Sequence, residues 1–220
     1  MKDASLQNKL IREAAEWRLI SLLFECPNIE WQKQVNDLAR EITDARLKKA
    51  ARFARDEATE GTYHSIFGPG GPAPPREVTY RSWVQPGYLL SELSAFYRAF
   101  SYEPKTEEVF DHISVETGFI AYLRLKQAYA LLNSNDEQAK VTARAAKTFV
   151  SDHLSKSAEQ LKKSLAFSGV NYLALASAAL LKRVGKDKDK DKRSRAILPV
   201  MSSVVEDDFE CADASTEGIW

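Results

Sequence analysis

Proline and glycine are concentrated in one short stretch of this chain. The segment 61–75, which reads GTYHSIFGPGGPAPP, holds four of the nine glycines and four of the eight prolines. No regular helix or central strand is expected at that density, because proline lacks a backbone donor and has a fixed φ. Proline-rich segments are also stiff. The sequence therefore predicts an ordered, extended loop rather than a flexible linker.

The rest of the chain up to residue 184 has the apolar period of helices. No strand-like alternation and no internal repeat interrupts it, so we predict an all-α fold with a single helical domain over residues 1–184. Trp17 and Trp31 lie on apolar helix faces and are expected in the core. Helical patterns occupy residues 5–24, 29–55, 88–103, 111–133, 137–154, 156–167 and 170–182.

The last part of the chain, residues 185–220, has a different composition. It begins with the lysine–aspartate run GKDKDKDKRSR at 185–195 and continues into an acidic tail. The run is of low complexity and strongly solvated, and the tail has only a weak apolar pattern, which is typical of disorder. We predict that residues 185–220 are disordered or loosely packed.

Charge and cysteine content exclude several function classes. Lysine plus arginine and aspartate plus glutamate each number 31, whereas a nucleic-acid binder normally has a basic excess. No apolar run reaches the roughly 18 residues of a membrane span. Glu13, Glu16 and Arg18 interrupt the segment that most resembles a signal sequence. Cys26 and Cys211 lie far apart and suggest neither a disulfide framework nor a metal site. We expect a cytoplasmic protein without stable membrane insertion.

Standard catalytic motifs are missing from the sequence. The chain has three histidines, His64, His112 and His153, and it lacks the zinc-protease, Walker, Rossmann and nucleophile-elbow motifs. The glycines at 68–71 are flanked by prolines, so this segment is a weak candidate for a phosphate-binding loop. His153 follows Asp152 at the end of a predicted helix, where we expect it to act as a helix-terminal charge partner.

Asp111, His112 and Glu116 form the most suggestive cluster of titratable residues. His112 and Glu116 are four residues apart and share one helix face, and Asp111 is well placed to cap the helix start. A helix cap with a structural hydrogen bond is one interpretation. A functional group, in which the carboxylate orients the imidazole, is the other. A metal-dependent phosphohydrolase would need further histidines, and in that class the adjacent pair runs His then Asp.

Two aromatic residues follow the proline-rich stretch in a polar setting. Tyr80 and Trp83 are surrounded in sequence by Arg76, Glu77 and Arg81. Aromatic side chains on a stiff loop suit peptide recognition, because they bury a large area at a low entropic cost. The alternative is that they fasten the loop to the helices.

Several motifs, in this order, resemble the TorD/DmsD/NarJ family of maturation chaperones for molybdenum enzymes, over about residues 5–184. The most specific are GPG-x-P-x-PP-x-E-x-x-Y at 68–80, Leu-x-x-Phe-Tyr at 93–97 and Asp-His-Ile-x-x-Glu at 111–116, and FVSDHL follows at 149–154. Some positions depart from the family pattern. Arg76 replaces a frequent aromatic residue, Val109 and Phe110 replace a common Glu-Pro pair, and Ser157 stands where a tryptophan is often seen.

The resemblance implies a TorD-like helical chaperone that is not an enzyme. Such proteins bind the twin-arginine signal peptide, the body, or both, of one apoenzyme, and hold it until its pterin-based molybdenum cofactor is inserted. The implied partner is the catalytic subunit of a molybdenum enzyme of the dimethyl sulfoxide reductase type. No resident cofactor or metal is implied. Transient contact with molybdopterin guanine dinucleotide or a guanine nucleotide stays open.

The resemblance also implies a peptide-binding site. Tyr80, Asp111 and His112 match the family's peptide-binding positions, and Glu77 and Glu116 match its motifs. A cationic and then apolar peptide needs carboxylates beside aromatic surface. The predicted binding residues are Glu77, Tyr80, Trp83, Tyr97, Asp111, His112 and Glu116. Two alternatives remain open: a metal-dependent phosphohydrolase that uses Asp111, His112 and Glu116, and a generic helical interaction scaffold.

Overall fold

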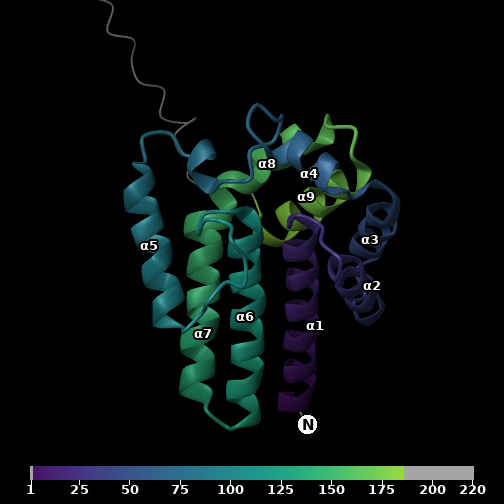
Figure 1. The fold of residues 1–220 in the computed structure, drawn as a ribbon. Coiled ribbons are helices and arrows are strands. Elements are labelled where there is room, and N and C mark those ends of the chain that lie inside the picture. The colour runs from purple at the N-terminus through teal and green to yellow at the C-terminus, as the bar shows by residue number, and fades with distance from the viewer. Residues whose placement is uncertain (1, 186–220) are drawn as a thin grey trace, which may run out of the picture. The chain divides into compact units, whose positions relative to one another are not determined.

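The computed structural model describes residues 2–185, and this part of the chain is helical (Figure 1). It contains no β-strand, only one isolated bridge between Arg76 and His112. The predicted all-α fold is therefore confirmed. The elements in chain order are α1 (Lys2–Leu23), α2 (Trp31–Glu41), α3 (Ala45–Glu57), α4 (Glu60–Phe67), the 3₁₀ turn η1 (Glu77–Tyr80), α5 (Pro86–Ala99), α6 (Ile113–Leu132), α7 (Asp136–Phe149), the π turn η2 (Val150–Leu154), α8 (Ser155–Ala166) and α9 (Asn171–Val184).

The helix α6 lies at the centre of the described fold. It packs between α1 and α7, with α5 beyond α7 and with α2 and α3 on the other side of α1 (Figure 1). Residues 111–121 are buried without interruption. A helix that is buried on all sides must be apolar or have its polar groups paired. The start of α6 is therefore the place where polar residues most need partners.

The prediction of a loop over 61–75 is wrong for its first half, where α4 forms. Thr59 caps this helix by accepting a hydrogen bond from the Thr62 backbone N–H. Tyr63, Ile66 and Phe67 are buried on its inner face. Gly61 is the one breaker among these residues, because the prolines start only at position 69. Core packing therefore outweighs the low helix propensity of this stretch.

The ordered loop begins at Gly68. Two of its glycines are needed for close backbone contact, since a Cβ on Gly68 would lie 2.4 Å from the His64 carbonyl oxygen. A Cβ on Gly71 would lie 2.4 Å from the Ile66 carbonyl oxygen. The loop folds back onto the end of α4, where the Ala73 N–H donates to Ile66. The predicted ordered loop is thus confirmed from residue 68 onward.

The expected core tryptophans are confirmed. Trp17 and Trp31 are buried, and the indole N–H of Trp31 donates to the Leu22 carbonyl at 2.7 Å. None of the helices within residues 2–185 is long and apolar enough to cross a bilayer. Residues 186–220, including Cys211 and the charged segment, lie outside the described residues.

An aromatic cluster joins α5, α6 and α7. Phe149 is fully buried, and its ring centroid lies 4.9 Å from that of Phe119 and 5.4 Å from that of Phe96. The Tyr97 ring also packs on Phe119 at 4.9 Å. Edge-to-face pairs of this kind stabilise beyond the area that they bury.

We expect Phe149→Ala to lower the free energy of unfolding by about 3–5 kcal/mol, because the substitution leaves a cavity that the neighbouring aromatic rings cannot fill. Urea denaturation followed by circular dichroism measures this. The control is Phe167→Ala, at a site 91% exposed, where a change within about 0.5 kcal/mol is expected. Similar losses in both variants would show that Phe149 is not central to the core.

Candidate functional site at the junction of the loop and α6

The proline-rich loop is hydrogen bonded directly to the segment before α6. The Glu77 N–H donates to the Asp111 carbonyl at 2.8 Å, and the Ile113 N–H donates to the Pro75 carbonyl at 2.9 Å. Arg76 and His112 form the antiparallel bridge between them. These bonds bring together two motifs that the sequence keeps about 35 residues apart.

Asp111 holds the loop and does not cap α6, contrary to the prediction. Its side chain is completely buried, and the Arg76 Nε donates to its two oxygens at 2.9 and 3.2 Å. The Val78 N–H donates to one of the same oxygens at 3.4 Å. A buried carboxylate with a guanidinium and a backbone donor is well compensated for its loss of water.

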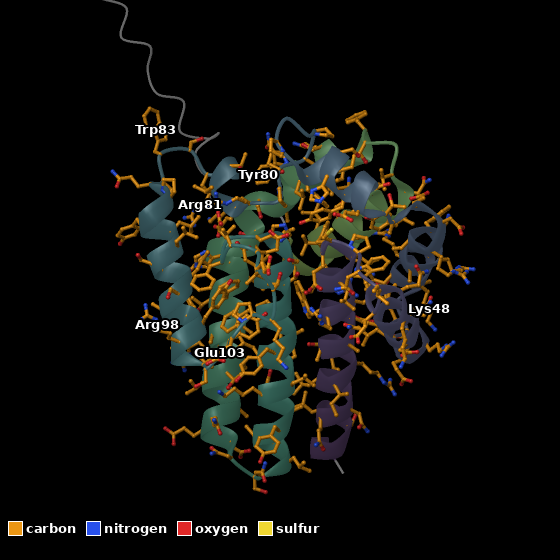
Figure 2. All side chains as sticks on the ribbon, viewed as in Figure 1. Lys48, Tyr80, Arg81, Trp83, Arg98 and Glu103 are labelled. Atoms are coloured by element: carbon orange, nitrogen blue, oxygen red, sulfur yellow. The ribbon has the colours of Figure 1, made fainter. Side chains whose placement is uncertain are left out.

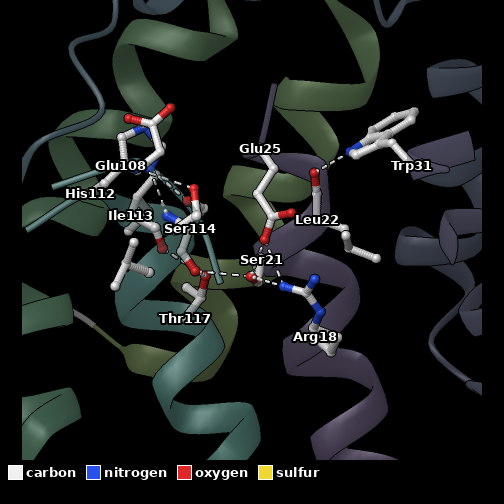
Figure 3. A network of polar contacts seen from close by, with 12 residues as sticks. Arg18, Ser21, Leu22, Glu25, Trp31, Glu108, His112, Ile113, Ser114 and Thr117 are labelled. Carbon is white, nitrogen blue, oxygen red and sulfur yellow. Dashed lines mark hydrogen bonds and ion pairs between the residues drawn. The ribbon is translucent and has the colours of Figure 1, made fainter. Parts of the chain in front are cut away.

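His112 is the residue that caps α6. Its Nδ1 accepts from the Ser114 N–H at 3.2 Å (Figure 3). Its Nε2 lies 3.2 Å from the Tyr63 hydroxyl oxygen. That hydroxyl donates to Glu108 at 2.7 Å. Burial lowers the pKa of His112 below its usual value. A neutral ring with its proton on Nε2 satisfies all these contacts, so the chain of donors runs from His112 through Tyr63 to Glu108.

Glu77 ties the loop to the π turn η2. Its buried carboxylate accepts from the Arg81 guanidinium at 2.8 Å and lies 3.0 Å from the Nδ1 of His153. The expectation that His153 is a helix-terminal charge partner is wrong. It is fully buried, and its ring packs on Phe96 and Phe149. The four-residue spacing of Phe149 and His153 is the sequence signal that places this histidine on an apolar face.

Glu116 is fully buried beside this group. No hydrogen-bond donor of another residue meets its carboxyl oxygens. Burial raises its pKa well above the usual range, and the Glu77 carboxylate and Asp111 raise it further, against a smaller effect of Arg81. A raised pKa favours the neutral, protonated form of this buried carboxyl group.

The aromatic residues of the predicted site lie in different settings. Tyr97 is buried, with its hydroxyl donating to the Phe110 carbonyl. Tyr80 is half-buried, and its hydroxyl donates to Pro74 at 2.6 Å, which fastens the loop onto itself. Burial raises the pKa of Tyr80 to about 12. Trp83 is fully exposed and stands clear of the ribbon (Figure 2), with a φ of 70°.

Five of the seven predicted residues meet at the junction and are buried there. Glu77, Tyr97, Asp111, His112 and Glu116 have almost no exposed surface. Side-chain surface for a partner remains on Tyr80 and Trp83. Between residues 2 and 185, no three or more His, Cys, Asp or Glu side chains are grouped to hold a metal ion.

Replacing Glu116 should change how stability depends on pH. The folded-state pKa is raised, so above about pH 4.5 the unfolded chain releases a proton that the folded protein keeps, and stability falls as pH increases. The Glu116→Gln side chain has nearly the same size and does not ionise. We expect its melting temperature relative to wild type to increase steadily from pH 5 to pH 8.

Glu92→Gln is the matched control, because Glu92 is exposed on α5. Its difference from wild type should stay the same at each pH. Thermal melts followed by circular dichroism across the series measure both. A constant difference for Glu116→Gln would show that Glu116 does not keep its proton in the folded protein.

Comparison with known proteins places this chain in a family. A search of curated proteins found no match. A family model described as the nitrate reductase delta subunit matches residues 29–162. The match covers more than half of the chain and includes the whole junction of the loop and α6. The family that the motifs suggested is therefore confirmed: the chain belongs to the nitrate reductase delta subunit family of NarJ/TorD-type chaperones for redox enzyme maturation.

Proposed function

We propose that this protein is a cytoplasmic chaperone for the catalytic subunit of a molybdenum enzyme of the dimethyl sulfoxide reductase type. It binds the apo form through the twin-arginine signal peptide, the body, or both. It holds that form until the pterin-based cofactor is inserted, which prevents premature export. Membership of the nitrate reductase delta subunit family supports the chaperone role.

The observation that carries the proposal is an exposed tryptophan on a tightly held support. Trp83 is fully exposed and has a left-handed φ of 70°, which is unfavourable for a bulky residue. The chain just before it is fixed by Arg76 on Asp111 and by Glu77 on His153. A backbone that is already held loses less entropy when a partner covers the large aromatic side chain that it carries.

The buried residues of the predicted site then act by positioning the loop. Glu77 and Asp111 have side chains with no exposed surface, so a partner would reach them only if the loop moved. His112 and Glu116 complete the polar contacts beneath it. We propose that they hold Tyr80 and Trp83 in place for the client, and that Tyr97 supports them from the aromatic cluster.

Co-purification tests the proposed function. The tagged full-length protein should retain the catalytic subunit of a molybdenum enzyme in its cofactor-free form. Deleting the gene should lower the molybdenum content of that enzyme, because the apo form loses its protection. The proposal is wrong if no such subunit is retained and the molybdenum content stays unchanged.

Two variants distinguish a residue that contacts the client from a residue that positions the loop. Trp83→Ala should leave the melting temperature unchanged and reduce client retention severalfold, because only exposed surface is lost. Asp111→Ala should reduce retention and also destabilise the fold by about 1–3 kcal/mol, because Arg76 and the Val78 N–H lose their acceptor. Quantitative pull-down and thermal melts measure the two effects. Wild-type retention by Trp83→Ala would contradict its role as a contact.

A further inference from the structure

The helix α3 has a face of unbalanced positive charge. Between Ala45 and Arg55 its sequence, ARLKKAARFAR, contains five basic residues and no carboxylate. Four of these cations are exposed and Lys48 is half-buried. The full set is Arg46, Lys48, Lys49, Arg52 and Arg55. The excess is local, because basic and acidic residues are equal in number over the whole chain.

Packing of α3 turns these cations away from the core. The helix packs on α9 and α2, and its buried residues are Leu47, Ala50, Ala51 and Ala54. Positions 46, 49 and 52, and positions 48, 52 and 55, are three or four residues apart, so the cations fill the outer half of the helix. Lys48 lies on the side of the described fold away from Trp83 (Figure 2). This face is therefore separate from the exposed tryptophan.

The carboxylates at the two ends of α3 are engaged elsewhere. Asp44 caps the helix and accepts from the Arg183 guanidinium at 3.1 Å. Glu57 accepts from the Asn171 side chain at 2.6 Å. Asp56 is exposed and follows the last of the cations. Among residues 2–185, no carboxylate forms an ion pair with any of the five cations of α3.

The helices packed on α3 supply no excess of negative charge. The end of α9 adds two cations, Lys182 and Arg183, and this helix has no carboxylate. In α2 the acidic residues Asp37 and Glu41 are matched by two basic residues, and Asp37 is paired with Arg40. The charge of the α3 face is therefore not neutralised by its surroundings.

This arrangement is unfavourable for the helix by itself. Like charges three or four residues apart repel each other. Arg46 and Lys48 also lie near the positive end of the helix dipole, and the first turn has no acidic residue to offset them. A local rule that is broken without a gain in packing is expected where a protein binds a partner. The missing counter-charge points to an anionic partner.

The composition of this face favours a lipid surface over a protein or a nucleic acid. The helix α3, which is described over its full length, has no exposed large apolar side chain. Its one aromatic residue, Phe53, is half-buried, with the Lys49 ammonium 5.7 Å from the ring centroid. Protein interfaces depend on buried aromatic and apolar anchors, whereas anionic headgroups attract basic residues by charge alone. Nucleic-acid binders normally have a basic excess over the whole domain, which this chain lacks.

We propose that the outer face of α3 binds the anionic headgroups of a phospholipid membrane without inserting into it. The cations from Arg46 to Arg55 extend about 14 Å along the helix, so several headgroups are contacted at once. Trp83, on the other side of the described fold, stays free for the client. An exported client must reach the membrane, and this contact brings the chaperone there. That use of the contact rests on the proposed function, whereas the lipid binding itself does not.

The test is co-sedimentation of the full-length protein with lipid vesicles. Vesicles of equal parts phosphatidylglycerol and phosphatidylcholine should bind the protein, and vesicles of phosphatidylcholine alone should not. Binding should fall steeply as salt increases from about 0.05 to about 0.5 M, because salt screens charges at an exposed surface.

Lys49→Gln/Arg52→Gln should lower the partition coefficient on anionic vesicles by about tenfold or more, because two of the five cations are lost. The matched control is Lys140→Gln/Arg144→Gln on α7, which also removes one exposed lysine and one exposed arginine. It should bind within about twofold of wild type. All four positions are exposed, so the thermal melts of both variants should match wild type.

Other outcomes would overturn the inference: no binding of wild type to anionic vesicles, equal binding to neutral vesicles, or equal losses in the two double variants. Poly-L-glutamate and a DNA duplex of about 20 base pairs represent an acidic protein and a nucleic acid. Binding to either that is stronger than binding to anionic vesicles and is lost in Lys49→Gln/Arg52→Gln would assign the face to that partner instead. The proposed function is judged separately, by client retention and molybdenum content.

Discussion

The pairing of residues 75–77 with residues 111–113 is the contact on which the rest of the site depends. It joins a stiff loop to the start of the most buried helix, and two short backbone hydrogen bonds form it. The ion pair of Arg76 with Asp111 reinforces the pairing from the side chains. Without it, the carboxylates of Glu77 and Asp111 would be buried with fewer partners, which is strongly unfavourable.

The junction concentrates ionisable groups where the protein interior is least tolerant of charge. Asp111 is paired with Arg76, and Glu77 is paired with Arg81 and His153. Burial raises the pKa of Glu116, which favours its uncharged form. Such an arrangement adds little net stability compared with apolar packing, but it fixes one geometry, because any other arrangement leaves a buried charge unpaired. A defined loop position is what a binding surface on that loop requires.

Sequence patterns predicted the helices well and the polar contacts poorly. Apolar periodicity identified the central helix, and proline density identified the loop from residue 68 onward. The helix α4 was missed because burial of Tyr63 and Phe67, which the local sequence does not reveal, stabilises it. The role of Asp111 was also mispredicted. Its position before α6 favours a helix cap by local rules, but its actual partner, Arg76, lies 35 residues earlier in the chain.

The candidate site was also predicted only in part. The motifs pointed to the correct region, yet side-chain burial at Glu77, His112 and Glu116 depends on how distant helices pack, which a single sequence does not encode locally. His153 was misassigned because its carboxylate partner lies 76 positions earlier in the chain. Leu125, Tyr129 and Leu132 on α6 are exposed, although an exposed apolar helix face has the same sequence period as a buried one.

The placement of α5 has a consequence for how this part of the molecule unfolds. The chain leaves the junction at Glu77, forms α5 and returns at Asp111, so the hydrogen bonds at the junction close this excursion into a ring, which also packs on α6 and α7 through Phe96 and Tyr97. Closing such a ring restricts the chain much as a cross-link does. When the closure breaks, both ends of the ring are freed together, so α5 and its flanking segments form one cooperative unit of local unfolding.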